Sequence, residues 1–133
     1  KGIQFFSTRV ETSPELVSQI PIEENIRSIT YAQDKVGIVT DNVEGGDPYK
    51  LRIYDREGSP VFEKTFNYQY TGFDIDGDLV LLYNDSSCKV YNMTGTEKYN
   101  GTFDFTVSKV SAGRFPGTLL VMGPQKMTEI KLQ

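Results

Sequence analysis

The sequence predicts an all-β fold built from β-propeller-type repeats, and three observations support this prediction. Short runs of β-branched and aromatic residues alternate with turn-forming clusters at a spacing of roughly 8–12 residues, which is typical of antiparallel sheets. One eight-residue pattern of residue types occurs twice along the chain. One strand-like run is apolar at every position, as expected for a sheet that is covered on both faces.

The internal repeat relates residues 51–58 to residues 88–95, a shift of 37 positions. Each copy places an aromatic residue, then Asp or Asn, then two further residues and a glycine. An Asp or Asn side chain bonds to the backbone ahead of it, and a glycine adopts the positive φ that closes a hairpin. We therefore expect Gly58 and Gly95 to occupy equivalent turns and to have positive φ.

The strands are expected in chain order, starting with a leading pair within residues 3–22. Three repeat units follow in a single domain of residues 1–133, at about residues 26–67, 68–104 and 105–133. The first two units are each predicted to be a four-stranded antiparallel meander, and the third ends after three strands. The clearest strands lie at residues 3–8, 16–20, 28–31, 36–40, 51–54, 61–66, 72–75, 79–83, 89–91, 107–111, 118–121 and 127–132.

The run Leu-Val-Leu-Leu-Tyr at residues 79–83 indicates how these meanders are arranged. A strand in a sheet with one open face alternates apolar and polar residues, and this strand does not. Four-stranded meanders that repeat about every 40 residues and stack face to face form a β-propeller. The alternative fold is a closed up-and-down barrel or a sandwich.

The composition excludes several functions. The net charge is −4, so the chain lacks the basic surplus that a nucleic-acid binder needs. It contains no histidine, which removes the commonest general base and metal ligand, and we expect no enzyme activity and no cofactor. The single cysteine, Cys88, is expected to be a buried, inert side chain. No run is long and apolar enough for this segment to insert into a membrane.

The acidic cluster at residues 74–78, followed by Asp85, resembles a calcium loop only superficially. Such a loop needs a glycine at its sixth position, where the chain bends sharply. Here Gly77 is fourth and Leu79 is sixth. The cluster therefore predicts an Asp-Gly hairpin, and no metal site is expected.

Three residues are candidates for ligand binding. Asp47 lies in an oxygen-rich loop at residues 41–48, which is a six-residue insertion relative to the second repeat. Insertions in repeat arrays often carry recognition, although a solvated loop is the simpler interpretation. Tyr68 and Tyr70 occupy alternate positions between two units, where they either pack locally or form a platform for a peptide or glycan.

The repeated motif, Ile-Tyr-Asp-x-x-Gly at residues 53–58 and Val-Tyr-Asn-x-x-Gly at residues 90–95, is similar to the repeats of WD-type and quinoprotein-like propellers. Residues 51–58, 82–84, 88–95 and 129–132 together resemble the C-terminal half of an uncharacterised bacterial family, a domain of unknown function. The resemblance implies a membrane anchor followed by a propeller-like exterior domain, hence an extracytoplasmic location rather than the alternative, a cytoplasmic one. The tryptophans of quinoprotein blades are missing.

These observations favour a non-catalytic interaction or ligand-sensing module whose protein or glycan partner is unknown. The alternative is a glycan-active hydrolase that uses a propeller cleft. We also expect self-association through the strand from Leu16 to Ile20 and the strand from Met127 to Leu132, because an unpaired strand edge invites another chain. Residues 1–85 carry 15 acidic and 8 basic side chains, and residues 86–133 carry 3 and 6, which favours a head-to-tail approach.

Overall fold

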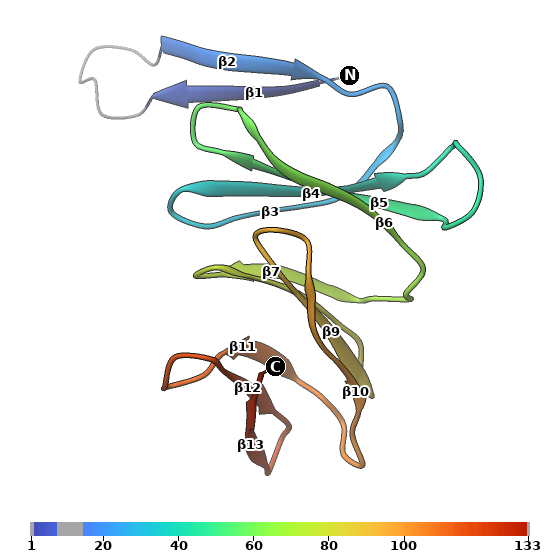
Figure 1. Cartoon of the computed structure of the whole chain (residues 1–133), viewed down its shortest axis with the longest axis vertical. Helices are drawn as coiled ribbons and strands as arrows, with labels where there is room; N and C mark the ends of the chain where they lie inside the picture. The colour runs from blue at the N-terminus through green and yellow to red at the C-terminus, as the bar shows by residue number, and fades with distance from the viewer. Residues whose placement is uncertain (1, 8–14, 133) are drawn as a thin grey trace. The chain divides into compact units, whose positions relative to one another are not determined.

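A computed structural model describes residues 2–7 and 15–132, which form strands and connecting turns without a helix. The described strands make four antiparallel sheets, and the chain divides into two compact units, Lys1–Asn67 and Tyr68–Gln133 (Figure 1). The strands are β1 (Gly2–Ser7), β2 (Glu15–Pro21), β3 (Ile26–Tyr31), β4 (Lys35–Asp41), β5 (Tyr49–Asp55), β6 (Pro60–Phe66), β7 (Gly72–Asp76), β8 (Leu79–Tyr83), β9 (Ser87–Asn92), β10 (Glu97–Thr102), β11 (Lys109–Ala112), β12 (Thr118–Met122) and β13 (Met127–Lys131).

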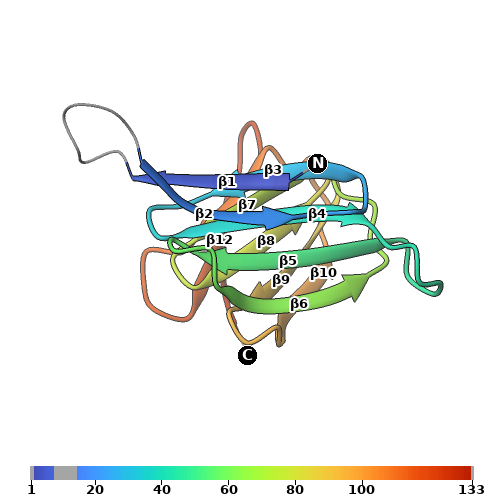
Figure 2. The same cartoon turned by 90° about the horizontal axis from the view of Figure 1, so that it is seen from above.

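The first unit contains the β1–β2 hairpin and a four-stranded sheet in the order β3-β4-β5-β6. These four strands lie side by side in sequence order, as Figure 2 shows. Ile22, Ile38 and Tyr54 form a buried cluster in this unit. Because Ile3 and Ile20 pack against that cluster, apolar contacts attach the hairpin to the sheet.

The second unit contains a four-stranded sheet in the order β10-β9-β8-β7 and a three-stranded sheet in the order β11-β12-β13. Its core consists of alternate side chains of β8, β9 and β12, together with one side chain of β11 and one from the segment before β11. The buried members are Leu79, Leu81, Cys88, Val90, Val107, Val110, Leu119 and Val121. Burying such side chains is the main favourable contribution to the stability of a unit this small.

The strand predicted at residues 79–83 is β8, and its burial confirms that both of its faces are covered. Leu79, Val80, Leu81 and Leu82 are all buried, although they point alternately to opposite faces of the sheet. The chain is therefore an all-β protein with the four-stranded antiparallel meanders of propeller blades. The closed barrel, one of the two alternative folds, is wrong, because the described strands form four separate sheets.

The repeat turns have the predicted geometry. Gly58 has a φ of 89° and Gly95 a φ of 82°, so the prediction of positive φ at both positions is confirmed. In the first turn Asp55 Oδ1 accepts hydrogen bonds from backbone N–H groups two and four residues ahead, at 3.0 and 2.9 Å. Asn92 Oδ1 makes the equivalent pair in the second turn, at 3.0 and 2.9 Å. The repeat thus reproduces individual hydrogen bonds as well as strand order.

The β12–β13 sheet has no fourth strand among the residues that the structure describes. β13 pairs with β12 in an unbroken register, whereas the edge strands β6 and β10 both meet their neighbours through a bulge. A bulge twists an edge away from further pairing, so β13 presents the more regular edge. In the described part of the chain, no helix has the length and hydropathy to span a bilayer.

Candidate functional site

The second unit contains a cavity of about 480 Å³ where three turns meet. Its wall is made by the β7–β8 hairpin, by the end of β9 with Lys98 of β10, and by the β11–β12 loop, with Leu132 at its edge. The volume lies within the range of roughly 300–1,000 Å³ that is usual for small-molecule sites. The cavity is therefore a candidate site in the second unit.

Asp76-Gly77-Asp78 forms the tight turn that connects β7 to β8 as a hairpin. Gly77 has a φ of 62°, in the left-handed region that glycine adopts without strain. Asp76 Oδ2 accepts a hydrogen bond of 2.8 Å from the backbone N–H of Ala112. This contact joins the hairpin to the opposite sheet and brings Asp78 to the cavity wall.

The β11–β12 loop is held by its own hydrogen bonds and by Glu129 of β13. The guanidinium of Arg114 donates to Glu129 Oε1 from Nη2 at 2.8 Å and from Nε at 3.1 Å, and the backbone N–H of Arg114 donates to Oε2 at 2.8 Å. The hydrogen bonds from Arg114 lower the pKa of Glu129, which keeps this carboxylate ionised. Thr118 Oγ1 donates to the carbonyl of Phe115 at 2.6 Å, and Gly117 has a φ of 75°. The loop is therefore ordered before any ligand arrives.

Phe115 is the main apolar group of this wall, and it is 62% exposed. The guanidinium carbon of Arg114 lies 5.5 Å from the centre of its ring, as in a cation–π contact. Lys98 and Asp78 also line the cavity, and neither side chain makes an ion pair or hydrogen bond within the described residues. The cavity thus offers an aromatic ring, an unpaired ammonium group and an unpaired carboxylate.

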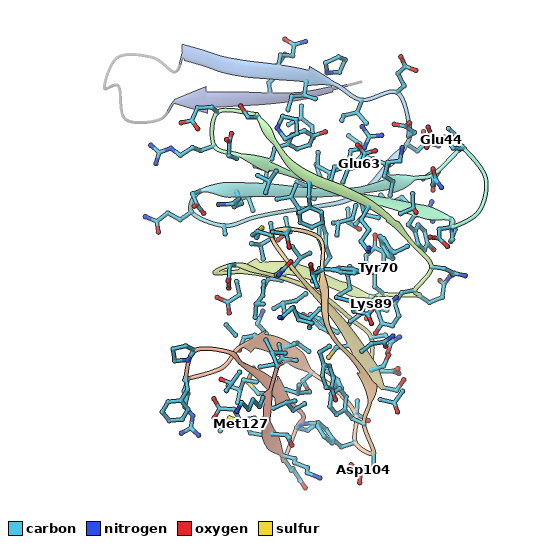
Figure 3. The ribbon with its side chains drawn as sticks, in the orientation of Figure 1. Glu44, Glu63, Tyr70, Lys89, Asp104 and Met127 are labelled. Carbon is cyan, nitrogen blue, oxygen red and sulfur yellow. The ribbon has the colours of Figure 1, made fainter. Side chains whose placement is uncertain are left out.

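A second concentration of charge lies in the first unit around Lys50. Figure 3 marks Glu44 in the β4–β5 loop and Glu63 on β6, and Lys50 Nζ lies 3.1 Å from a carboxylate oxygen of each. Hydrogen bonds to Glu44 and Glu63 raise the pKa of Lys50. Arg52 pairs with Glu24 beside them. Because these cations are already paired with carboxylates, the cluster serves to hold the loop on the sheet.

Asp47, a predicted site residue, belongs to the same loop. Its carboxylate accepts a hydrogen bond of 3.1 Å from Thr65 Oγ1, and its carbonyl accepts one of 2.8 Å from Asn42 Nδ2. Its contacts thus hold the inserted loop against β6. The structure places no other predicted site residue beside it in the first unit.

Tyr68 and Tyr70, the other predicted site residues, lie in the segment before β7 and are both half-buried. The hydroxyl of Tyr68 lies 2.7 Å from Ser87 Oγ, and burial raises the pKa of Tyr68. Tyr70, marked in Figure 3, makes an edge contact with Phe73 at a ring separation of 6.3 Å. Neither tyrosine lines the 480 Å³ cavity.

The residues of the cavity were missed at the sequence level. The β11–β12 connection, Ala-Gly-Arg-Phe-Pro-Gly, contains a large aromatic side chain between glycines, where turn-forming and polar residues are usual. An aromatic residue at this place in a turn is therefore a sequence signal that could have marked Phe115 as a candidate binding residue. Nothing in the sequence links Lys98 to the loop, because the two are brought together only by packing of the sheets.

The structure describes no group of three or more metal-ligating side chains within residues 2–7 and 15–132. Cys88 is fully buried, as predicted, and burial raises the pKa of its thiol to about 12. A protonated thiol without contact to solvent is a poor nucleophile and a poor metal ligand.

The comparisons with known proteins concern the family and the fold. The model of a family of unknown function (DUF5711) matches residues 1–132. None of the curated proteins that were compared matches the chain. The crystal structure of HIRA(644–1017), a propeller-type neighbour, is similar with a TM-score of 0.56 and 12% identity. The match covers 82% of this chain and 35% of that one, so the chain spans about a third of its neighbour's length. Because the identity is low, the likeness shows a shared fold and nothing more.

Proposed function

The chain belongs to the DUF5711 family of unknown function, and from this premise we propose that it is a non-catalytic recognition module that binds a ligand in the cavity of its second unit. The observation that carries the proposal is an exposed Phe115 on a loop that is already ordered, beside unpaired Lys98 and Asp78. An ordered site does not have to lose loop entropy when its ligand binds.

A hydrolase that acts on glycans is the alternative, because two carboxylates, Asp76 and Asp78, line the same cavity. Glycoside hydrolysis needs one carboxyl group on each side of the scissile bond. Here the two carboxylates come from one hairpin tip, and Asp76 is hydrogen-bonded to the backbone of Ala112. That arrangement supports a binding role better than a catalytic one. Release of reducing sugar by the wild-type chain, lost in Asp78→Asn, would establish the hydrolase instead.

The experiment that tests the binding function is an NMR screen of the isotope-labelled chain. The panel contains short peptides of varied charge, small metabolites and oligosaccharides. We expect at least one class to shift the backbone amide signals of residues 76–79 and 112–118, and Phe115→Ala to abolish the shifts. The function is contradicted if no class shifts these amides, or if the shifts persist in Phe115→Ala.

We further propose that the module works on the extracytoplasmic side of a bacterial membrane, as the resemblance of its repeat motifs implies. Fusing alkaline phosphatase, which is active only outside the cytoplasm, to the end of the native gene product tests this location. An inactive fusion that becomes active when β-galactosidase replaces the phosphatase would contradict it.

A further inference from the structure

The charged side chains that line the cavity are two acidic and two basic residues, so their formal charges cancel. Asp76 and Asp78 supply carboxylate oxygens on the hairpin side, and Lys98 supplies an ammonium group from β10. Arg114 supplies a guanidinium from the loop, although two of its nitrogens are engaged with Glu129. A ligand with one net charge would meet attraction and repulsion together at such a wall.

Phe115 adds an apolar platform to these groups. Its ring is 62% exposed even though the guanidinium of Arg114 lies over it, so area is left for a ligand. The loop hydrogen bonds keep the ring at the cavity wall. An aromatic face carries partial negative charge and therefore attracts the C–H groups on the flat side of a saturated ring.

A neutral sugar ring satisfies both features. Each of its hydroxyl groups donates one hydrogen bond and accepts others, so it can use the carboxylates and the ammonium group at the same time. Its C–H face packs on an aromatic ring. A zwitterionic amino acid would also meet both signs, but it depends on charge pairing, which contributes little at side chains as exposed as Arg114 and Asp78.

We propose that this cavity binds a neutral pyranose of an oligosaccharide, with Phe115 as the stacking platform and Asp78 and Lys98 as hydroxyl ligands. The inference rests on the proposed binding function and adds its ligand class. Lys98 also lines a second cavity of about 190 Å³, together with Glu97, Tyr99 and Asn100. Polar surface for another ring therefore continues past Lys98, so a ligand of two or more sugar units binds more tightly than a monosaccharide.

The test uses the full chain on a glycan array that includes neutral, acidic and amino sugars, followed by NMR titration with free disaccharides. The soluble probes are cellobiose, maltose, mannobiose and di-N-acetylchitobiose, with glycylglycine as the zwitterionic probe. We expect one neutral disaccharide to shift the amides of residues 112–118, with an affinity that does not change between low and high salt. Phe115→Ala should weaken that affinity about tenfold or more.

The matched control is Tyr31→Ala, which removes an aromatic side chain that is 75% exposed in the first unit and does not line the cavity. It should leave sugar affinity unchanged, and thermal melts should show that both variants are folded. The inference is overturned if no neutral glycan binds, if Tyr31→Ala weakens binding as much as Phe115→Ala, or if glycylglycine binds and high salt abolishes binding. Binding of a peptide at the same amides would overturn the sugar inference and leave the recognition function intact.

Discussion

Replacing Gly95 by valine tests whether the repeat turn determines the stability of the second unit. Gly95 has a φ of 82°, and its N–H donates to the carbonyl of Asn92 at 3.1 Å. Asn92 Oδ1 also accepts from the N–H groups of Thr94 and Thr96, and the N–H of Asn92 donates to the carbonyl of Thr96 at 2.9 Å. These hydrogen bonds fix the backbone of the turn before and after Gly95, so residue 95 cannot change to a negative φ without breaking several of them.

The expected loss follows from that geometry. An L-residue in the left-handed region costs about 1–2 kcal/mol, and a β-branched side chain is worse, so we expect Gly95→Val to lower the free energy of unfolding by about 1–3 kcal/mol. For a chain of this size, this corresponds to a Tm lower by on the order of 5–10 °C. Gly58→Val should have a similar effect, because Gly58 has a φ of 89° in the equivalent turn.

Urea unfolding followed by circular dichroism measures the effect, with Met93→Ala as the control in the same turn. Met93 is half-buried and no hydrogen bond of its side chain defines the turn, so its truncation should cost clearly less than Gly95→Val. Equal losses for Gly95→Val and Met93→Ala would refute the argument that backbone conformation controls this turn. A harmless Gly58→Val would refute the equivalence of the two turns.

Three further outcomes are expected. Hydrogen bonding to the backbone and the charge of Arg52 lower the pKa of Glu24 in the folded chain. The ionised carboxylate therefore stabilises the fold at pH values above the unfolded pKa of about 4.3, and this stabilisation is lost as the pH falls through the folded pKa. Glu24→Gln should flatten the dependence of Tm on pH in that acidic range, and an unchanged slope would contradict this. At pH 8 the thiol of Cys88 should not react with Ellman's reagent until urea is added, and rapid labelling of the folded chain would show that it is accessible. Within residues 2–7 and 15–132 the outer edge of β13 has no partner strand, so the strand from Met127 to Leu132 should pair with the strand from Leu16 to Ile20 of a second copy and give a dimer in sedimentation at micromolar concentration. A strict monomer, or a dimer that survives a Thr128→Pro substitution in that edge, would exclude this pairing.

The sequence alone was enough to predict the sheets and the repeat turns. Strand position follows from the alternation of apolar residues and from turn-forming clusters, which act between near neighbours in the chain. The turns at Gly58 and Gly95 were predictable for the same reason, because an Asp or Asn three residues before a glycine makes its hydrogen bonds within the turn itself. The unbroken apolar run of β8 likewise predicted that side chains on both faces of this strand are buried.

Charged residues were less predictable. Lys50 stands in a strand where a charged residue is normally solvated, yet its side chain is only 8% exposed. It tolerates that position because Glu44 reaches it from the inserted loop and Glu63 from the neighbouring strand. The sequence shows the three charges, but their convergence depends on the register of β5 against β6 and on the path of the loop.

The sequence by itself determined that the chain is an all-β, propeller-type protein, and it correctly predicted a hairpin at Asp76-Gly77-Asp78. Only the tertiary structure decided that Asp76 accepts a hydrogen bond from the backbone of Ala112, and that this hairpin, Lys98 and the loop around Phe115 line one cavity. The physical reason is the range of the forces involved. Strands and turns are specified by residues a few positions apart, whereas a binding wall is made by side chains that meet only when separately folded sheets pack on a shared apolar core.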